Sequence, residues 1–334
     1  MAESSENLLR QTSRTFYLTL RVLPAAVRPQ ISLAYLLART TDTIADTEIL
    51  PPTDRLAALQ KLHERILDTV ATPLDFDKLA RQQCLPAERL LLEQVETSLA
   101  DLQNLSPADR SLVRAVLDTI TSGQELDLQR FAGATVENII ALRTDAELDD
   151  YTYRVAGCVG EFWTKICRAH VFPNTALDDA RLIAEGIRFG KGLQLVNILR
   201  DLPADLRKGR CYLPVEKLTA LGLSPQDLLD PANEPKLRQL YHAHLDLAKA
   251  HLAAGWNYTN SLPWRCTRLR VACAWPILIG AQTIGQLRLA NILDASQRVK
   301  ISRGAVRTLI LGSMLRYPFP GAWRKQFLAQ NCNH

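Results

Sequence analysis

Residues 190–214, GKGLQLVNILRDLPADLRKGRCYLP, contain the feature that most restricts how this chain can fold. Asp201 and Asp205 lie four residues apart, and Gln194 and Asn197 continue their helical face upstream. Such a pair is usually a solvated helix face, but the leucines, isoleucine and valine around it indicate burial. Buried carboxylates repel each other and lose hydration, and a divalent cation relieves both costs. Mg²⁺ with phosphate oxygens is the typical partner of so few carboxylates.

A second stretch, YLLARTTDTIAD at residues 35–46, has the same pattern. Tyr35, Arg39, Asp42 and Asp46 follow one another at spacings of four, three and four, so they share one face of a helix. We expect the two carboxylate pairs to face each other across a cavity and to hold a substrate diphosphate through Mg²⁺. The cations would also neutralise the charge on a leaving diphosphate.

Four motifs together resemble the squalene/phytoene synthase family. They are SRTF at residues 13–16, the stretch 35–46, YTYRVAGCVG at residues 151–160, and the stretch 194–205. The resemblance runs from about residue 8 to about residue 315, and within the family it is nearest to bacterial squalene synthases. It implies an all-α, single-domain, isoprenoid-synthase-type helical bundle around a central cavity over residues 1–315, followed by a C-terminal tail at 316–334.

The resemblance also implies a reaction. A squalene synthase, a prenyltransferase of sterol or hopanoid biosynthesis, joins two farnesyl diphosphates head to head with Mg²⁺ and reduces presqualene diphosphate to squalene with NADPH. Phytoene, dehydrosqualene or presqualene diphosphate synthesis without the NADPH step remains an alternative. A non-catalytic assembly partner with the same fold is an alternative of another class. The four aspartates argue against it, because idle carboxylates on apolar helices only destabilise.

The resemblance assigns roles to individual residues. The predicted metal ligands are Asp42, Asp46, Asp201 and Asp205. The residues expected to bind diphosphates or line the substrate site are Ser13, Arg14, Tyr35, Arg39, Asn197, Arg200, Val155 and Ala156. The residues expected at the reaction centre are Tyr151, Phe16, Gln194 and Arg39. For Val155 and Ala156 a second interpretation stays open, because the small residues of this motif are also typical of close helix packing.

Residues 299–304, VKISRG, resemble a basic segment associated with NADPH in squalene synthases. Lys300 and Arg303 would contact the cofactor phosphates, whereas Ser302 replaces a basic residue. A basic turn before a helix is the alternative interpretation. The chain has no GxGxxG element, so a nicotinamide cofactor would bind without a Rossmann fold.

Two local features set further expectations. Pro203 lies between the second pair of aspartates and removes a helix hydrogen bond, so it should kink or loosen that turn. The tail combines aromatic with basic residues and is too short and polar to span a bilayer. Either it packs on the body of the protein or it contacts a membrane interface.

Composition excludes several classes of protein. Hydrophobic residues make up 47% of the 334 residues and there are only 15 glycines, which favours helices over a turn-rich β fold. The net charge of +5 is mild and mixed, so nucleic acid is not expected as a partner, while an anionic substrate or membrane surface is compatible. Seven cysteines without a CxxC spacing, and the lack of a signal or transmembrane pattern, predict a cytoplasmic protein that is peripheral to the membrane at most. The sequence predicts no oligomeric state.

Overall fold

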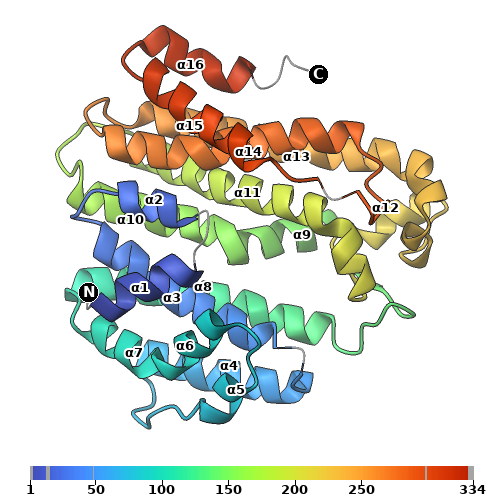
Figure 1. Ribbon diagram of the computed structural model, residues 1–334, viewed down its shortest axis with the longest axis horizontal. Coiled ribbons are helices and arrows are strands. Elements are labelled where there is room, and N and C mark those ends of the chain that lie inside the picture. The colour runs from blue at the N-terminus through green and yellow to red at the C-terminus, as the bar shows by residue number, and fades with distance from the viewer. Residues whose placement is uncertain (1–2, 13–15, 48, 298, 330–334) are drawn as a thin grey trace. The chain divides into compact units, whose positions relative to one another are not determined.

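The computed structural model describes residues 3–12, 16–47, 49–297 and 299–329. Within these ranges the chain is helical apart from loops and two short strands, which confirms the predicted all-α class (Figure 1). The helices form two compact units. One comprises Met1–Ala132 with Phe162–Thr175, and the other comprises Gly133–Glu161 with Ala176–His334.

The first unit is built around helix α3 (Arg28–Ala45). Its other helices are α1 (Glu3–Thr12), α2 (Phe16–Val22), α4 (Pro52–Leu67), α5 (Asp77–Arg81), α6 (Pro86–Glu93), α7 (Val95–Gln103) and α8 (Pro107–Arg130). Helix α3 contacts α4, α6, α7 and α8, because its apolar residues, among them Leu36, Leu37 and Ile44, are almost fully buried. Proline in the first turn of α4, α6 and α8 fixes where those helices begin.

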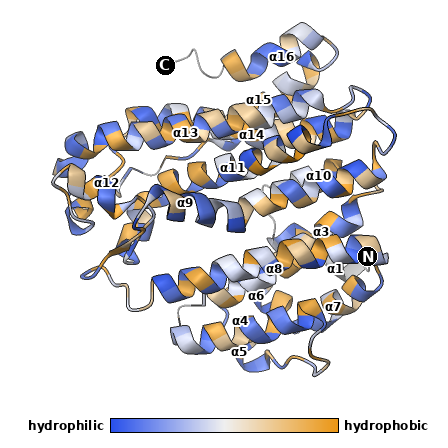
Figure 2. Ribbon diagram, turned by 180° about the vertical axis from the view of Figure 1, so that it is seen from behind, coloured by the Kyte–Doolittle hydropathy of each residue, from blue (hydrophilic) through white to orange (hydrophobic). Residues whose placement is uncertain are grey.

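The second unit is centred on three long helices, α11 (Asp179–Arg207), α13 (Glu234–Ser261) and α14 (Thr267–Leu289), which pack against one another. Figure 2 shows hydrophobic and hydrophilic residues alternating along them, the pattern of helices that are buried on one side. The remaining elements are α9 (Asp145–Thr152), π-helix η1 (Tyr153–Gly157), α12 (Val215–Ala220), the 3₁₀ turns η2 (Gln226–Leu229) and η3 (Pro231–Asn233), α15 (Arg303–Arg316) and α16 (Pro320–Ala329). Helix α10 (Cys158–His170) begins in this unit, and its residues from Phe162 onward belong to the first unit.

Glycines allow η1 and the start of α10 to touch α11 through their backbones. A Cβ atom on Gly160 would lie 1.9 Å from the carbonyl oxygen of Gly186, and one on Gly190 would lie 2.1 Å from that of Ala156. Real Cβ atoms do not approach a backbone so closely. The small residues of the 151–160 motif therefore do support close helix packing.

Two short parallel strands fix the chain that follows α11. Strand β1 (Ile140–Ala141) pairs with β2 (Arg210–Cys211). Gly209 ends the helix with a φ of +76°, and a Cβ there would lie 2.4 Å from the backbone nitrogen of Thr135. Glycine is thus needed both for the left-handed backbone and for the close approach.

The last two helices pack on α13 and α14, and a buried cation among aromatic rings lies in this contact. The Arg270 guanidinium lies 4.7 Å from the Trp264 ring centre and 5.6 Å from that of Trp323, and it donates to the carbonyl of Leu262. Trp323 is fully buried and stacks on Trp256. These contacts hold the segment from α15 to α16 on α13 and α14. Among the described residues, no helix has both the length and the hydropathy needed to cross a bilayer.

Candidate functional site

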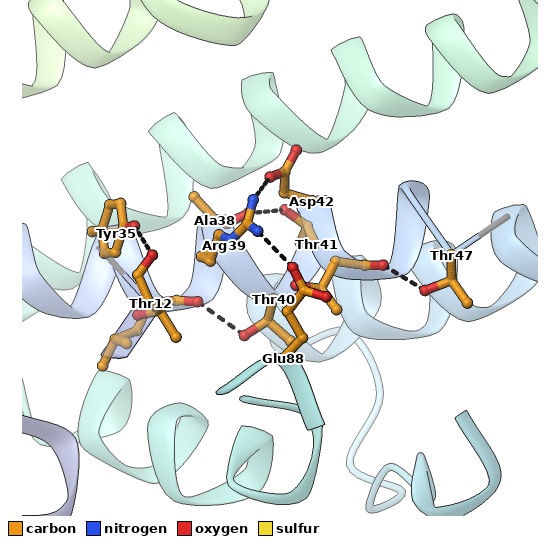
Figure 3. A network of polar contacts seen from close by, with 11 residues as sticks. Thr12, Tyr35, Ala38, Arg39, Thr40, Thr41, Asp42, Thr47 and Glu88 are labelled. Carbon is orange, nitrogen blue, oxygen red and sulfur yellow. Dashed lines mark hydrogen bonds and ion pairs between the residues drawn. The ribbon is translucent and has the colours of Figure 1, made fainter. Parts of the chain in front are cut away.

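The first predicted stripe lies on α3, as its periodicity required. Tyr35, Arg39 and Asp42 are half-buried, and exposed Asp46 follows the last helical residue, its backbone N–H bonded to the carbonyl of Asp42 at 2.9 Å. Figure 3 shows the Arg39 guanidinium between two carboxylates. Its Nη1 pairs with Asp42, and its Nη2 lies 2.8 Å from Oε1 of Glu88 on α6.

In this cluster several carboxylates lie close to one another, and the Arg39 guanidinium is the cation that binds two of them. Loss of hydration raises the pKa of Asp42 to about 6, the neighbouring Asp46 carboxylate adds to the rise, and Arg39 opposes it. Burial disfavours the charged form of Arg39, but Asp42 and Glu88 outweigh this effect and leave the pKa of Arg39 above its usual value. Arg39 therefore stays protonated and anchors the carboxylates.

The other predicted residues of the first unit are located only in part. The Tyr35 hydroxyl donates to the backbone carbonyl of Thr12 on α1 at 3.2 Å. Phe16 is the first residue of α2. Ser13 and Arg14 lie outside the described residues, so their predicted contacts with diphosphate stay predictions.

The second stripe lies near the end of α11. Arg200 holds Asp201 in a two-point ion pair, with Nε–Oδ1 at 2.9 Å and Nη2–Oδ2 at 2.5 Å. This contact raises the pKa of Arg200 against the opposing effect of its burial. Gln194 is half-buried and Asn197 is exposed, on the face that also carries Asp201.

Pro203 does not end the helix, and the predicted kink or loosening of this turn stays a prediction. Helix α11 runs as one helix from Asp179 to Arg207 with the proline inside it. Asp201 and Asp205 therefore keep helical i,i+4 spacing and share a face. The carbonyl of Leu199, which proline cannot bond, instead accepts a hydrogen bond from the hydroxyl of Tyr241 on α13 at 2.9 Å.

Tyr151 has an aromatic partner that the sequence did not reveal. Its ring stacks on that of Tyr212 at 4.8 Å between centres and 25° between planes, and the two hydroxyls lie 3.4 Å apart. Both side chains are buried. Tyr212 directly follows β2, and the pairing of β2 with β1 fixes the backbone just before it.

The remaining predicted residues lie in the second unit as well. Val155 and Ala156 are half-buried within the π-helix, a distortion that often occurs at functional sites. Lys300 and Arg303 are exposed before and at the start of α15. Ser302 is the N-cap of that helix, because its hydroxyl accepts from the N–H of Ala305 at 3.1 Å.

The carboxylate pairs suit a divalent cation in the chemistry of their donors. A cation would relieve the lost hydration and the repulsion that raise the pKa of Asp42. Each predicted pair supplies only two carboxylates, and among the described residues no three His, Cys, Asp or Glu side chains are grouped as a metal site. A bound Mg²⁺ would therefore complete its shell with water and with oxygens of a ligand.

Three residues of this region escaped the sequence analysis. Glu88, Tyr212 and Tyr241 contact Arg39, Tyr151 and the α11 backbone respectively. Only Tyr212 had a local signal, since it closely follows the second aspartate pair. Glu88 and Tyr241 look like ordinary residues of amphipathic helices. The predicted meeting of the two aspartate pairs, one in each unit, stays a prediction.

Comparison with known proteins gives a consistent picture. A family model described as squalene/phytoene synthase matches residues 9–305. The 15-cis-phytoene synthase of Synechocystis sp. is 32% identical over 74% of this chain and 65% of its own length. Squalene synthase ERG9 of Saccharomyces cerevisiae is 28% identical over 92% of this chain and 66% of its own length.

A solved dehydrosqualene synthase, crystallised with a ligand, superposes with a TM-score of 0.66 at 22% identity, covering 93% of this chain and 95% of that one. At this identity the likeness shows a shared fold. The chain spans about two fifths to two thirds of the length of the curated relatives that head the comparison.

Proposed function

The chain belongs to the squalene/phytoene synthase family, and from that premise we propose that it is a squalene synthase. It would condense two farnesyl diphosphates head to head to presqualene diphosphate and reduce this intermediate to squalene. The observation that carries the proposal is the pair of aspartates on one helix face in each unit, with the first aspartate of each pair bound to an arginine of the same helix. This combination suits a prenyltransferase that takes diphosphate substrates.

The residues of α3 and α11 would bind the diphosphates. Asp42, Asp46, Asp201 and Asp205 would hold Mg²⁺, which when bound supplies positive charge to the leaving diphosphate. Arg39 stays protonated because Asp42 and Glu88 raise its pKa, so it can donate charge-assisted hydrogen bonds to phosphate oxygens. Tyr35, Asn197 and Arg200, with Ser13 and Arg14, would orient the same groups.

The tyrosine pair would serve the carbocation. Tyr151 and Tyr212 are stacked and buried, so they offer ring faces and phenol oxygens in a site from which water is excluded. An aromatic face attracts positive charge, most strongly where solvent is absent. Gln194 would line the same reaction centre, Phe16 would shield the cation, and Val155 and Ala156 would border the isoprenoid chain.

The reduction step distinguishes a squalene synthase from its relatives. Lys300 and Arg303 would bind the phosphates of NADPH, which supplies hydride when bound. Both side chains are exposed, and the N-terminus of α15 at Ser302 adds a favourable dipole for an anion. Without this step the same condensation ends at presqualene diphosphate or proceeds to dehydrosqualene or, with C20 substrates, to phytoene.

Product analysis tests the whole proposal. The protein is incubated with Mg²⁺ and either farnesyl or geranylgeranyl diphosphate, with and without NADPH, and the lipid products are identified by mass. We expect squalene from farnesyl diphosphate only when NADPH is present, and presqualene diphosphate when it is absent. A C40 product, a C30 hydrocarbon formed without NADPH, or presqualene diphosphate as the end product even with NADPH would replace the proposed activity with a relative's. No product under any condition would favour a non-catalytic assembly role.

Peripheral membrane contact is the second part of the proposal, and it rests on the surface of α15. Four apolar side chains, which we call the α15 patch, are more than half exposed: Leu311, Met314, Leu315 and Phe319. Seven of the 40 lysines and arginines, and none of the 35 acidic residues, fall in residues 295–334. An apolar patch within a purely basic segment is complementary to an anionic membrane interface.

We expect the α15 patch to bind vesicles of phosphatidylglycerol and phosphatidylcholine in a salt-sensitive manner. Leu311→Glu with Leu315→Glu places two acids one helical turn apart within the patch and should weaken vesicle binding roughly tenfold or more in co-sedimentation. Leu85→Glu, at an exposed leucine of the first unit, is the control and should bind like the wild type. Equal binding by all three proteins would refute the membrane contact and leave the catalytic proposal unaffected.

A further inference from the structure

The helix that carries the second aspartate pair contains a residue that should weaken it. Pro203 lies two residues from each aspartate of the Asp201–Asp205 pair and has no N–H to donate to the carbonyl of Leu199. Leu199 is only 1% exposed, so solvent is poorly placed to replace the missing donor. A buried carbonyl without a partner is destabilising, and it would favour opening of this turn.

The hydroxyl of Tyr241 supplies the missing donor. It lies 2.9 Å from the Leu199 carbonyl oxygen, and the tyrosine side chain is 1% exposed. Burial raises the pKa of Tyr241, so the phenol keeps its proton and acts as a donor. One side chain of α13 thus satisfies the one backbone group that Pro203 leaves unbonded in α11.

The packing of α13 on α11 fixes where this hydroxyl lies. The two helices run alongside each other in the second unit (Figure 1). A Cβ on Gly192 would lie 2.9 Å from Cβ of His251, and a Cβ on Gly255 would lie 2.9 Å from the Phe189 ring. These close approaches set the distance and the register of the helices upstream of Pro203, so Tyr241 is held against the Leu199 carbonyl.

We propose that Tyr241 is a positioning residue for Asp201 and Asp205. By bonding the Leu199 carbonyl it keeps the turn around Pro203 helical, and the two carboxylates stay on one face. Tyr241 would not touch the substrate or the metal itself. The inference rests on the proposed function only in assigning the carboxylates to Mg²⁺; the effect on the helix is independent of that assignment.

Tyr241→Phe removes the hydroxyl and little else. In the protein without added metal or substrate, we expect amide hydrogen exchange to become roughly tenfold faster or more for Asp205, Leu206 and Arg207, the residues after the proline. With Mg²⁺ and farnesyl diphosphate, the Mg²⁺ concentration for half-maximal rate should rise several-fold. Tyr258→Phe, at another buried tyrosine of α13, is the control and should leave exchange in this turn unchanged.

A double-mutant cycle separates positioning from general packing. Pro203→Ala restores an N–H that can bond the Leu199 carbonyl, so Tyr241→Phe should change exchange by less than about twofold in that background. An equal effect of Tyr241→Phe with proline or alanine at 203 would overturn the proposal, as would unchanged exchange in the single variant. Since exchange is measured without turnover, an absence of squalene synthesis would count against the proposed function and not against this inference.

Discussion

Asp42→Asn and Asp201→Asn are each expected to abolish the first condensation while the protein stays folded. Each change replaces a carboxylate by a neutral amide at one pair and removes a ligand for a cation that offsets the charge of the diphosphate. A loss of several kcal/mol of transition-state stabilisation corresponds to a rate reduction of roughly 10²- to 10⁴-fold. Formation of presqualene diphosphate from farnesyl diphosphate, followed by mass, is the measurement.

The stability of Asp42→Asn should be equal to or above that of the wild type at pH 7. Burial raises the pKa of Asp42 in the folded protein to about 6, above its value in the unfolded chain. The carboxyl group therefore stabilises the fold most at a pH below the unfolded-state pKa, and this stabilisation is lost as the pH rises through 6. At neutral pH the ionised group is therefore a net cost to the fold, and asparagine removes it. A carboxylate that lowers the stability of the fold is expected where a bound cation or substrate offsets its charge.

A matched control tests whether the loss of any carboxylate, or only the loss of one from an aspartate pair, reduces turnover. Asp75→Asn also removes one carboxylate from the first unit. In the wild type, Oδ1 of Asp75 accepts a hydrogen bond from the backbone N–H of Asp77 at 3.0 Å, and the amide oxygen of asparagine can accept the same bond. We expect wild-type turnover and melting temperature from it. Wild-type turnover by Asp42→Asn or Asp201→Asn would contradict the metal assignment, whereas unfolding of either would show that the carboxylate is structural.

Helical spacing explains why the two stripes were predictable. Residues four apart on one helix share a face whatever the rest of the fold does, so the sequence alone placed Tyr35, Arg39 and Asp42 together. The Arg39–Glu88 pair joins residues 49 apart, and the Tyr241–Leu199 bond joins residues 42 apart. Contacts of that separation depend on how helices pack, which no local pattern in this chain records.

At Pro203 the local rule is correct, but the response of the helix depends on a residue far away in the sequence. Proline does remove the bond to Leu199, yet a side chain from another helix fills the gap and α11 continues. The tail shows the same limit. Tyr317 and Trp323 are buried against Arg270 and Trp264, so part of the segment packs on the body of the protein, while Phe319 is exposed and membrane contact stays a prediction.

The other large effect is expected from Gly160→Ala, and it decides between the two interpretations of the small-residue motif. The added Cβ would lie 1.9 Å from the Gly186 carbonyl oxygen, and a backbone atom cannot rotate away as a side chain can. Separating α10 from α11 should cost roughly 3 kcal/mol or more, which outweighs the gain of about 1 kcal/mol that alanine brings to a helix. Chemical denaturation is the measurement.

Gly321→Ala is the control, and it should change stability in the opposite direction. Nothing lies within 4 Å of a Cβ at this position in the first turn of α16, so only the gain in helix propensity remains and stability should rise slightly. If Gly160 serves instead to leave room for an isoprenoid chain, Gly160→Ala would fold with wild-type stability and make shorter or fewer products. Loss of stability in Gly160→Ala but not in Gly321→Ala means that the motif sets the spacing of the helices that carry Tyr151 and Asp201. Any space for substrate is then a consequence of that packing.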